Sequence, residues 1–113
     1  MINQSENDFR KICDISELQN GRGKRFIVDD KEVAVFKIDD ELFALYNVCP
    51  HQHFNFIYDG IIERDCVICP IHGWRFELET GKNPDGGKGL ERYPVKVIDD
   101  IVCIKVSNTK RPW

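Results

Sequence analysis

Two short motifs, Cys49-Pro50-His51 and Cys69-Pro70-Ile71-His72, constrain the fold of this chain more than any other feature. Each motif carries one cysteine and one histidine at the spacing of metal ligands, and seventeen residues separate the two motifs. Structural zinc sites of the finger type instead pair two cysteines with two histidines on a following helix. A thiolate and an imidazole supplied twice suit a two-iron centre, in which the thiolates bind one iron and the imidazoles bind the other. We therefore expect the fold to present two loops side by side.

The remainder of the chain alternates short strand-like runs with turn residues and has no long segment with the 3.6-residue period of a helix. Strands are expected at residues 9–14, 24–28, 32–38, 41–46, 61–62, 66–68, 74–78, 93–98 and 101–106. Turns are expected at three aspartate pairs, 29–30, 39–40 and 99–100, and Gly21 and Gly23 are expected to interrupt the strand pattern. Short strands with frequent turns predict an all-β sandwich or barrel, formed by one domain over residues 1–113.

Composition excludes several classes of function. The formal net charge is −3 and the pI is about 5.6, so the chain lacks the basic surface expected of a nucleic-acid-binding domain. No apolar run approaches the roughly 20 residues that cross a bilayer, and the polar, acidic residues 1–8 do not resemble a secretory signal. The five cysteines do not form the disulfide framework of a small secreted domain, which favours the reducing cytosol. We expect a cytoplasmic protein without a nucleic-acid or membrane partner.

The two motifs and the residues that follow them resemble the Rieske family of [2Fe-2S] proteins. The matching residues are Cys49, His51, Cys69 and His72, followed by Gly73-Trp74-Arg75-Phe76, Thr80-Gly81, Leu90 and Tyr93-Pro94-Val95. The resemblance implies a Rieske-like antiparallel β-sandwich or barrel with a small cluster-binding subdomain formed by loops. It also implies one [2Fe-2S] cluster, with Cys49 and Cys69 on one iron and His51 and His72 on the other. The cluster loops would be residues 49–56 and 69–76, covered by a proline- and glycine-bearing loop at about 83–89.

Departures from the family pattern narrow the subtype. High-potential members carry an extra cysteine in each cluster loop, and the two form a disulfide, whereas the positions here are Phe54 and Ile71. Those members also place serine and tyrosine donors where this chain has Trp74 and Phe76. With fewer hydrogen-bond donors than high-potential members have, this chain would stabilise the reduced, more negative cluster less. The resemblance therefore implies a potential toward the low end of the range of roughly −150 to +300 mV.

The resemblance implies a low-potential one-electron carrier without catalytic activity of its own, which passes electrons from a reductase to an oxygenase or another terminal redox enzyme. The alternative within the family is the small subunit of an NAD(P)H-dependent nitrite reductase, whose partner is the large subunit. Residues 23–28 and the segment Cys49-Pro50-His51-Gln52-His53 are more similar to this second group. Both alternatives require redox proteins as partners.

A zinc-binding interaction module is the alternative from another class. Cys66 and Cys69 form a C-x-x-C pair, which Cys49, His51 or His72 could complete as a tetrahedral site. Against this, Cys66 falls inside an apolar strand-like run, where strand alternation need not aim it at the same metal as Cys69.

The remaining cysteines and the third histidine have simpler explanations. Cys66 is expected to be a small buried hydrophobic residue. Cys13 and Cys103 lie in strand patterns and are expected in the core. His53 is expected to be a solvated loop residue, although it lies close to the first motif.

Overall fold

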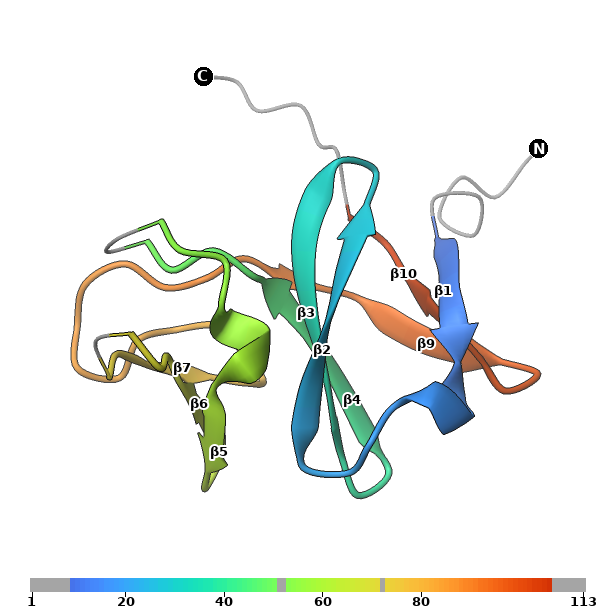
Figure 1. The fold of residues 1–113 in the computed structure, drawn as a ribbon, viewed down its shortest axis with the longest axis horizontal. Helices are drawn as coiled ribbons and strands as arrows, with labels where there is room; N and C mark the ends of the chain where they lie inside the picture. Colours follow the sequence, from blue (N-terminus) through green and yellow to red (C-terminus); the bar gives the residue numbers. More distant parts are fainter. Residues whose placement is uncertain (1–8, 51–52, 72, 107–113) are drawn as a thin grey trace.

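The computed structural model of the chain describes residues 9–50, 53–71 and 73–106. Within these residues the chain forms ten strands and two single-turn 3-10 helices, and the strands assemble into three antiparallel sheets (Figure 1). The strands are β1 (Arg10–Asp14), β2 (Arg22–Val28), β3 (Lys31–Ile38), β4 (Glu41–Tyr46), β5 (Ile61–Glu63), β6 (Cys66–Ile68), β7 (Arg75–Glu77), β8 (Arg92–Tyr93), β9 (Val95–Ile98) and β10 (Ile101–Ile104), and the helices are η1 (Ile15–Glu17) and η2 (Ile57–Asp59). The predicted all-β antiparallel fold is confirmed. No helix in this part of the chain is long and apolar enough to cross a membrane.

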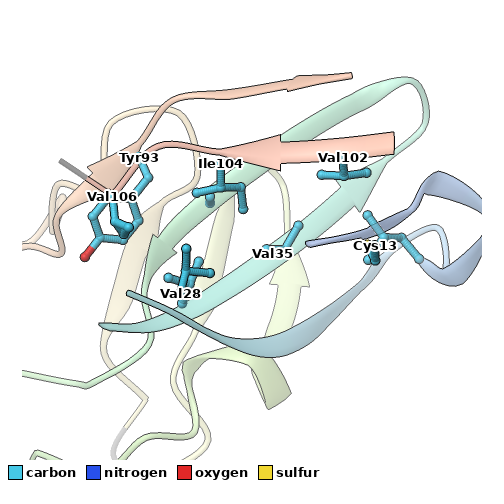
Figure 2. Close-up of a cluster of buried hydrophobic side chains, with 10 residues drawn as sticks. Cys13, Val28, Val35, Tyr93, Val102, Ile104 and Val106 are labelled. Carbon is cyan, nitrogen blue, oxygen red and sulfur yellow. The ribbon is translucent and has the colours of Figure 1, made fainter. Parts of the chain in front are cut away.

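The larger part of the molecule is a sandwich of two sheets. One sheet has the strand order β1-β10-β9 and the other has the order β2-β3-β4-β8. Figure 2 shows side chains of both sheets meeting in a first core, where Val102 and Ile104 of β10 lie opposite Val28 of β2 and Val35 of β3. Because these side chains exclude water from both inner faces, their burial holds the two sheets together.

The strand β3 is buried on both faces, which explains its unbroken apolar sequence. Val33 and Val35 point into the first core, whereas Ala34 and Phe36 point into a second core on the opposite side of the sheet. The small sheet β5-β6-β7 packs against this second core and lies on the other side of β2-β3-β4 from β9 and β10 (Figure 1). Phe36 is fully buried there, and such burial contributes about 1.5–3 kcal/mol per side chain.

The expected strand at residues 93–98 is in fact two strands in two different sheets. Tyr93 of β8 pairs with Ala44 of β4, whereas Val95 of β9 pairs with Ile104 of β10. Pro94 lies between them and lacks the backbone N–H that a continuous ladder needs. The prediction of one strand was wrong because proline at this position lets the chain leave one sheet and join the other.

The expected interruption at Gly23 is also wrong, because Gly23 lies inside β2 and pairs with Phe36 of β3. A Cβ atom at position 23 would lie 2.4 Å from the Tyr58 carbonyl oxygen and 2.5 Å from the Phe36 ring. Because Gly23 has no Cβ atom, η2 can approach the sheet closely at this position, and the strand continues through the glycine. Gly21, with φ of 82°, does lie in a turn before β2, as predicted.

The three aspartate pairs lie at hairpin turns, as predicted. Asp29 and Asp30 have φ of 49° and 68°, and Asp99 and Asp100 have φ of 51° and 67°. In these two pairs, positive φ at both central residues is the type I′ geometry that matches the twist of antiparallel strands. In the third pair, positive φ is found at Asp39, with φ of 57°. Aspartate tolerates this left-handed region better than most residues with a Cβ atom.

Candidate metal centre

The first cysteine loop follows β4 and is closed by two backbone hydrogen bonds at Cys49. The Cys49 N–H donates to the Phe54 carbonyl at 3.0 Å, and the His53 N–H donates to the Cys49 carbonyl at 2.7 Å. The turn leaves Cys49 only 1% exposed, whereas Phe54 is 43% exposed. His53 has φ of 61° and is exposed, as predicted for a solvated loop residue.

The second cysteine loop repeats the same backbone arrangement between β6 and β7. The Cys69 N–H donates to the Trp74 carbonyl at 2.8 Å, and the Gly73 N–H donates to the Cys69 carbonyl at 2.9 Å. Gly73 has φ of 76°, so a left-handed residue stands four positions after the cysteine in each loop. Glycine adopts this conformation without a steric cost, whereas His53 adopts it at some cost.

The fold brings the two predicted cysteine ligands into one group of buried side chains. Cys49 and Cys69 are both 1% exposed and both belong to the second core, against which the partly buried Trp74 packs. The other two predicted ligands, His51 and His72, lie outside the described residues. Among the residues that the structure describes, no three Cys, His, Asp or Glu side chains converge as a metal site. The described part of the predicted centre therefore consists of two thiols on equivalent loops.

Cys66 is only partly buried, so its expected place in the core is wrong. Val67 points into the second core, and strand alternation therefore turns Cys66 to the other face of the small sheet. There it lines a surface groove together with Asp65, Arg75 and Glu77. Partial burial, more than the neighbouring charges, raises the pKa of the Cys66 thiol. Cys66 does not belong to the buried group that contains Cys69, which weighs against a shared zinc site.

Cys13 and Cys103 lie in the core, as predicted. They are on the neighbouring strands β1 and β10, both are buried, and both are free thiols. The Cys103 thiol donates to the Ile101 carbonyl at 3.7 Å, and burial raises the pKa of the Cys13 thiol. Both cysteines therefore act as small apolar residues of the sandwich.

Asn47, which belongs to neither metal-ligand motif, supports the first cysteine loop. Among the described residues it is the one buried polar side chain, and it is fully inaccessible to solvent. Its Nδ2 donates to Glu32 Oε1 at 2.9 Å and to the Asn55 carbonyl at 3.0 Å, and its Oδ1 accepts from the Tyr58 N–H at 2.8 Å. The only sequence signal was a polar residue two positions before Cys49, and burial of that residue is a tertiary property.

The ionised carboxylate of Glu32 should make the stability of the wild-type chain depend on pH in the acid range. The guanidinium of Arg25, with a further contribution from Asn47, lowers the pKa of Glu32 from its ordinary 4.5 to about 2. The stabilisation by the charged carboxylate is complete above the ordinary pKa and is lost as the pH falls toward about 2. The free energy of unfolding of the wild-type chain should exceed that of Glu32→Gln, and this difference should shrink as the pH falls from 4.5 to about 2. Urea unfolding of both proteins at several pH values checks this, and a constant difference across the window would contradict it.

The glycine-rich loop after β7 is closed at its base by a backbone hydrogen bond, and an ion pair links it to the start of β7, next to the second cysteine loop. At the base, the Leu90 N–H donates to the Gly81 carbonyl at 2.7 Å. Farther out, the Arg75 guanidinium binds the Asp85 carboxylate, with Nη2 to Oδ1 at 2.9 Å. Figure 1 shows this loop on the same side of the molecule as both cysteine loops. Because Arg75 and Asp85 are both exposed, their ion pair orients the loop more than it stabilises the fold.

Comparison with known proteins identifies the family. The model of the Rieske-like [2Fe-2S] domain matches residues 8–105. The biphenyl dioxygenase ferredoxin subunit of Pseudomonas sp. (strain KKS102) is 31% identical over 101 residues, which cover 88% of this chain and 93% of that protein. The anthranilate 1,2-dioxygenase ferredoxin subunit of Burkholderia cepacia is 34% identical over 82 residues, which cover 71% of this chain and 75% of that protein.

The fold is also similar to that of a solved structure. A crystal structure of a proposed NADH-dependent nitrite reductase small subunit from Mycobacterium tuberculosis superposes on this chain with a TM-score of 0.84 at 26% sequence identity. The superposition covers 89% of this chain and 96% of that one. The chain therefore belongs to the Rieske-like [2Fe-2S] domain family, and its cofactor is one Rieske-type [2Fe-2S] cluster.

Proposed function

We propose that this chain is a low-potential one-electron carrier, a single Rieske domain in which Cys49 and Cys69 bind one iron and His51 and His72 bind the other. The observation that carries the proposal is the pair of buried thiols on two loops with the same backbone hydrogen bonds. Two thiolates from equivalent loops are the donor set that one iron of this cluster takes, so the described residues fit the cofactor. When bound, the cluster accepts and releases a single electron.

The cysteine loops also carry exposed apolar side chains suited to brief docking. Phe54 and Phe56 of the first loop are 43% and 38% exposed, with ring centroids 6.3 Å apart, and Ile71 of the second loop is 38% exposed. Exposed apolar side chains beside a cofactor support a contact with another protein. A carrier must leave after delivery, so a small, transient interface is expected. We propose a reductase and a terminal oxygenase as the partners, because the relatives named above are ferredoxin subunits of dioxygenases. We further propose a cytosolic location, on the cysteine usage described above.

The redox potential is the first property to measure. Phe54 and Ile71 stand where a disulfide occurs in high-potential relatives, and neither Trp74 nor Phe76 offers a hydroxyl group to the cluster. A titration should therefore give a one-electron midpoint in the lower half of the range of roughly −150 to +300 mV. A midpoint in the upper half would show that other donors compensate and would remove the low-potential part of the proposal.

Electron delivery tests the carrier function. The cluster-loaded chain is titrated into a dioxygenase reductase and its oxygenase, and turnover is measured against carrier concentration. Phe54→Ser should raise the half-saturating carrier concentration about fivefold, which corresponds to about 1 kcal/mol of lost contact, and should leave the maximal rate unchanged. Ile61→Ser is the matched control, because Ile61 is 67% exposed on β5, outside both cysteine loops. Equal effects of the two variants would place the docking surface elsewhere.

A second candidate function is the small subunit of an NAD(P)H-dependent nitrite reductase. The fold similarity to the Mycobacterium tuberculosis structure favours it, with a TM-score of 0.84. The two candidates differ in the lifetime of the complex. Co-purification of the chain in a stable complex with a nitrite reductase large subunit would favour the second candidate, whereas elution as a free, brown protein that supports oxygenase turnover would favour the first.

A further inference from the structure

The two cysteine loops share one backbone arrangement but are held to the fold in different ways. The second loop closes a hairpin, and its two ends are joined by the ladder in which Val67 pairs with Phe76 and Ile68 pairs with Arg75. The first loop runs from β4 to η2, and within the described residues no strand pairing joins its two ends. Its ends therefore need another connection if Cys49 is to keep a defined place relative to Cys69.

The side chain of Asn47 makes that connection. Asn47 stands at the start of the loop, and its carboxamide binds the backbone at the far end, through the Asn55 carbonyl at 3.0 Å and the Tyr58 N–H at 2.8 Å. A backbone carbonyl and a backbone N–H are thus both satisfied by one side chain. This is the role that the β6–β7 ladder performs for the second loop.

Asn47 is in turn anchored to the central sheet. Its second Nδ2 hydrogen goes to Glu32 Oε1 at 2.9 Å, and its backbone N–H donates to the Glu32 carbonyl at 3.0 Å. Glu32 lies on β3 and binds Arg25 of β2 through both carboxylate oxygens. The first cysteine loop is therefore tied to two strands of the sheet through a continuous series of polar contacts.

Truncating Asn47 would leave its partners without a replacement. The side chain is fully buried, so water cannot readily take over the bonds to Asn55 and Tyr58. Those two groups belong to the loop itself, whereas the first core lies on the opposite face of the sheet. The damage should thus fall on the position of the first cysteine loop more than on the sandwich.

We propose that Asn47, backed by Glu32, is the residue that positions the first cysteine loop around the cluster and thereby slows loss of the cluster and sets its electronic environment. The inference rests on the proposed binding of the cluster by Cys49. Asn47 would not touch the iron or its ligands, so it is a positioning residue. The competing explanation is that Asn47 is a core polar residue that contributes only to overall stability.

The test compares Asn47→Ala with Val102→Ala in the cluster-loaded chain. Val102 is fully buried in the first core, so its truncation lowers overall stability without touching the cysteine loops. Each variant is studied at a urea concentration that gives the same fraction of unfolded protein. There, transfer of iron to a chelator should be about tenfold or more faster from Asn47→Ala than from Val102→Ala, by analogy with the loss of metal affinity caused by removing a residue that orients a metal ligand. The EPR spectrum of the reduced protein should shift in Asn47→Ala only.

Glu32 provides a second, milder series in case Asn47→Ala does not fold. Compared at urea concentrations that give the same fraction of unfolded protein, Glu32→Gln keeps an acceptor for the Asn47 amide and should release iron at nearly the wild-type rate. Glu32→Ala removes that acceptor and should release iron about threefold faster or more, with the same direction of EPR shift, as expected for a weaker version of the same effect. Rates in Asn47→Ala that match those in Val102→Ala, with an unchanged EPR spectrum, would overturn the inference. Equal rates for the two Glu32 variants would do the same.

The outcome is separable from a failure of the proposed function. If Cys49→Ser retained the wild-type cluster, the ligand assignment would fail, whatever Asn47→Ala does. If Cys49→Ser loses the cluster and Asn47→Ala behaves like Val102→Ala, the ligand assignment stands and only the positioning role fails. Hydrogen exchange of the loaded chain adds a readout that does not depend on the iron. The Tyr58 amide should lose protection in Asn47→Ala, whereas the Val67 amide in the β6 ladder should keep it.

Discussion

Cys49→Ser and Cys69→Ser are each expected to yield a colourless chain without the Rieske-type spectrum. A serine hydroxyl is a harder and far less acidic donor than a thiol, so it does not replace a thiolate on iron of an iron–sulfur cluster. Because both cysteines are 1% exposed, a serine oxygen at either position is also held where water cannot hydrate it. Iron and sulfide content per chain, visible absorption and EPR of the reduced protein measure the result.

Two control variants separate ligand loss from other effects. Cys103→Ser also replaces a buried cysteine, at 3% exposure in β10, so it reproduces the cost of burying a hydroxyl without touching the proposed centre. It should keep the full cluster. Cys66→Ser tests the zinc alternative and should also keep the spectrum, because Cys66 lies on the other face of the small sheet. Loss of the cluster in Cys66→Ser, or a colourless wild-type chain with one zinc, would overturn the ligand assignment.

Gly81→Ala is expected to destabilise the cluster-loaded chain by about 3 kcal/mol. Gly81 has φ of 79°, and a Cβ atom there would lie 2.0 Å from the Leu90 carbonyl oxygen. The left-handed backbone costs a residue with a Cβ about 1–2 kcal/mol. Overpacking against backbone adds about 1–3 kcal/mol, and backbone cannot rotate away as a side chain can. Urea unfolding with a shared slope measures the difference.

Gly86→Ala is the matched control for this effect. Gly86 has φ of 93° in the same loop, but a Cβ atom there meets nothing within 4 Å. Gly86→Ala should therefore lower the free energy of unfolding only by the strain of a left-handed backbone, which is about 1–2 kcal/mol. If the two variants were equally stable, the Gly81–Leu90 contact would not close the base of the loop. Faster cluster loss in Gly81→Ala than in Gly86→Ala, at equal fractions of unfolded protein, would support the covering role that the family resemblance implies for residues 83–89.

Local patterns in the sequence predicted most strands and turns. β4 and β6 have the predicted bounds, because each is a short apolar run that ends at turn residues. The aspartate pairs predicted hairpin turns because aspartate tolerates positive φ. Predictions failed where a distant segment determined the outcome. Gly23 stays inside β2 because Tyr58 packs against it, and Pro94 divides one strand between two sheets.

The cysteine ligands of the candidate centre could be predicted from the sequence, whereas the backbone arrangement of the two loops and the support by Asn47 could not. Cys49 and Cys69 could be identified from their motifs, and the structure buries both in one group of side chains. The equivalent backbone of the two loops was not predictable. His53 and Gly73 both have positive φ at the same place in their loops, but a histidine and a glycine give no common sequence signal. Nor was the role of Asn47, since its partners lie up to 15 residues away along the chain.

The sequence by itself determined the kinds of ligand offered, the spacing of the two motifs and the alternation that makes short strands, because each of these depends on neighbouring residues. Only the tertiary structure decided which cysteines are buried together and which one, Cys66, faces the surface. It also decided that one cysteine loop is held by a strand ladder and the other by Asn47. The physical reason is that burial and hydrogen-bond closure depend on contacts between segments far apart in the chain, which no local pattern encodes.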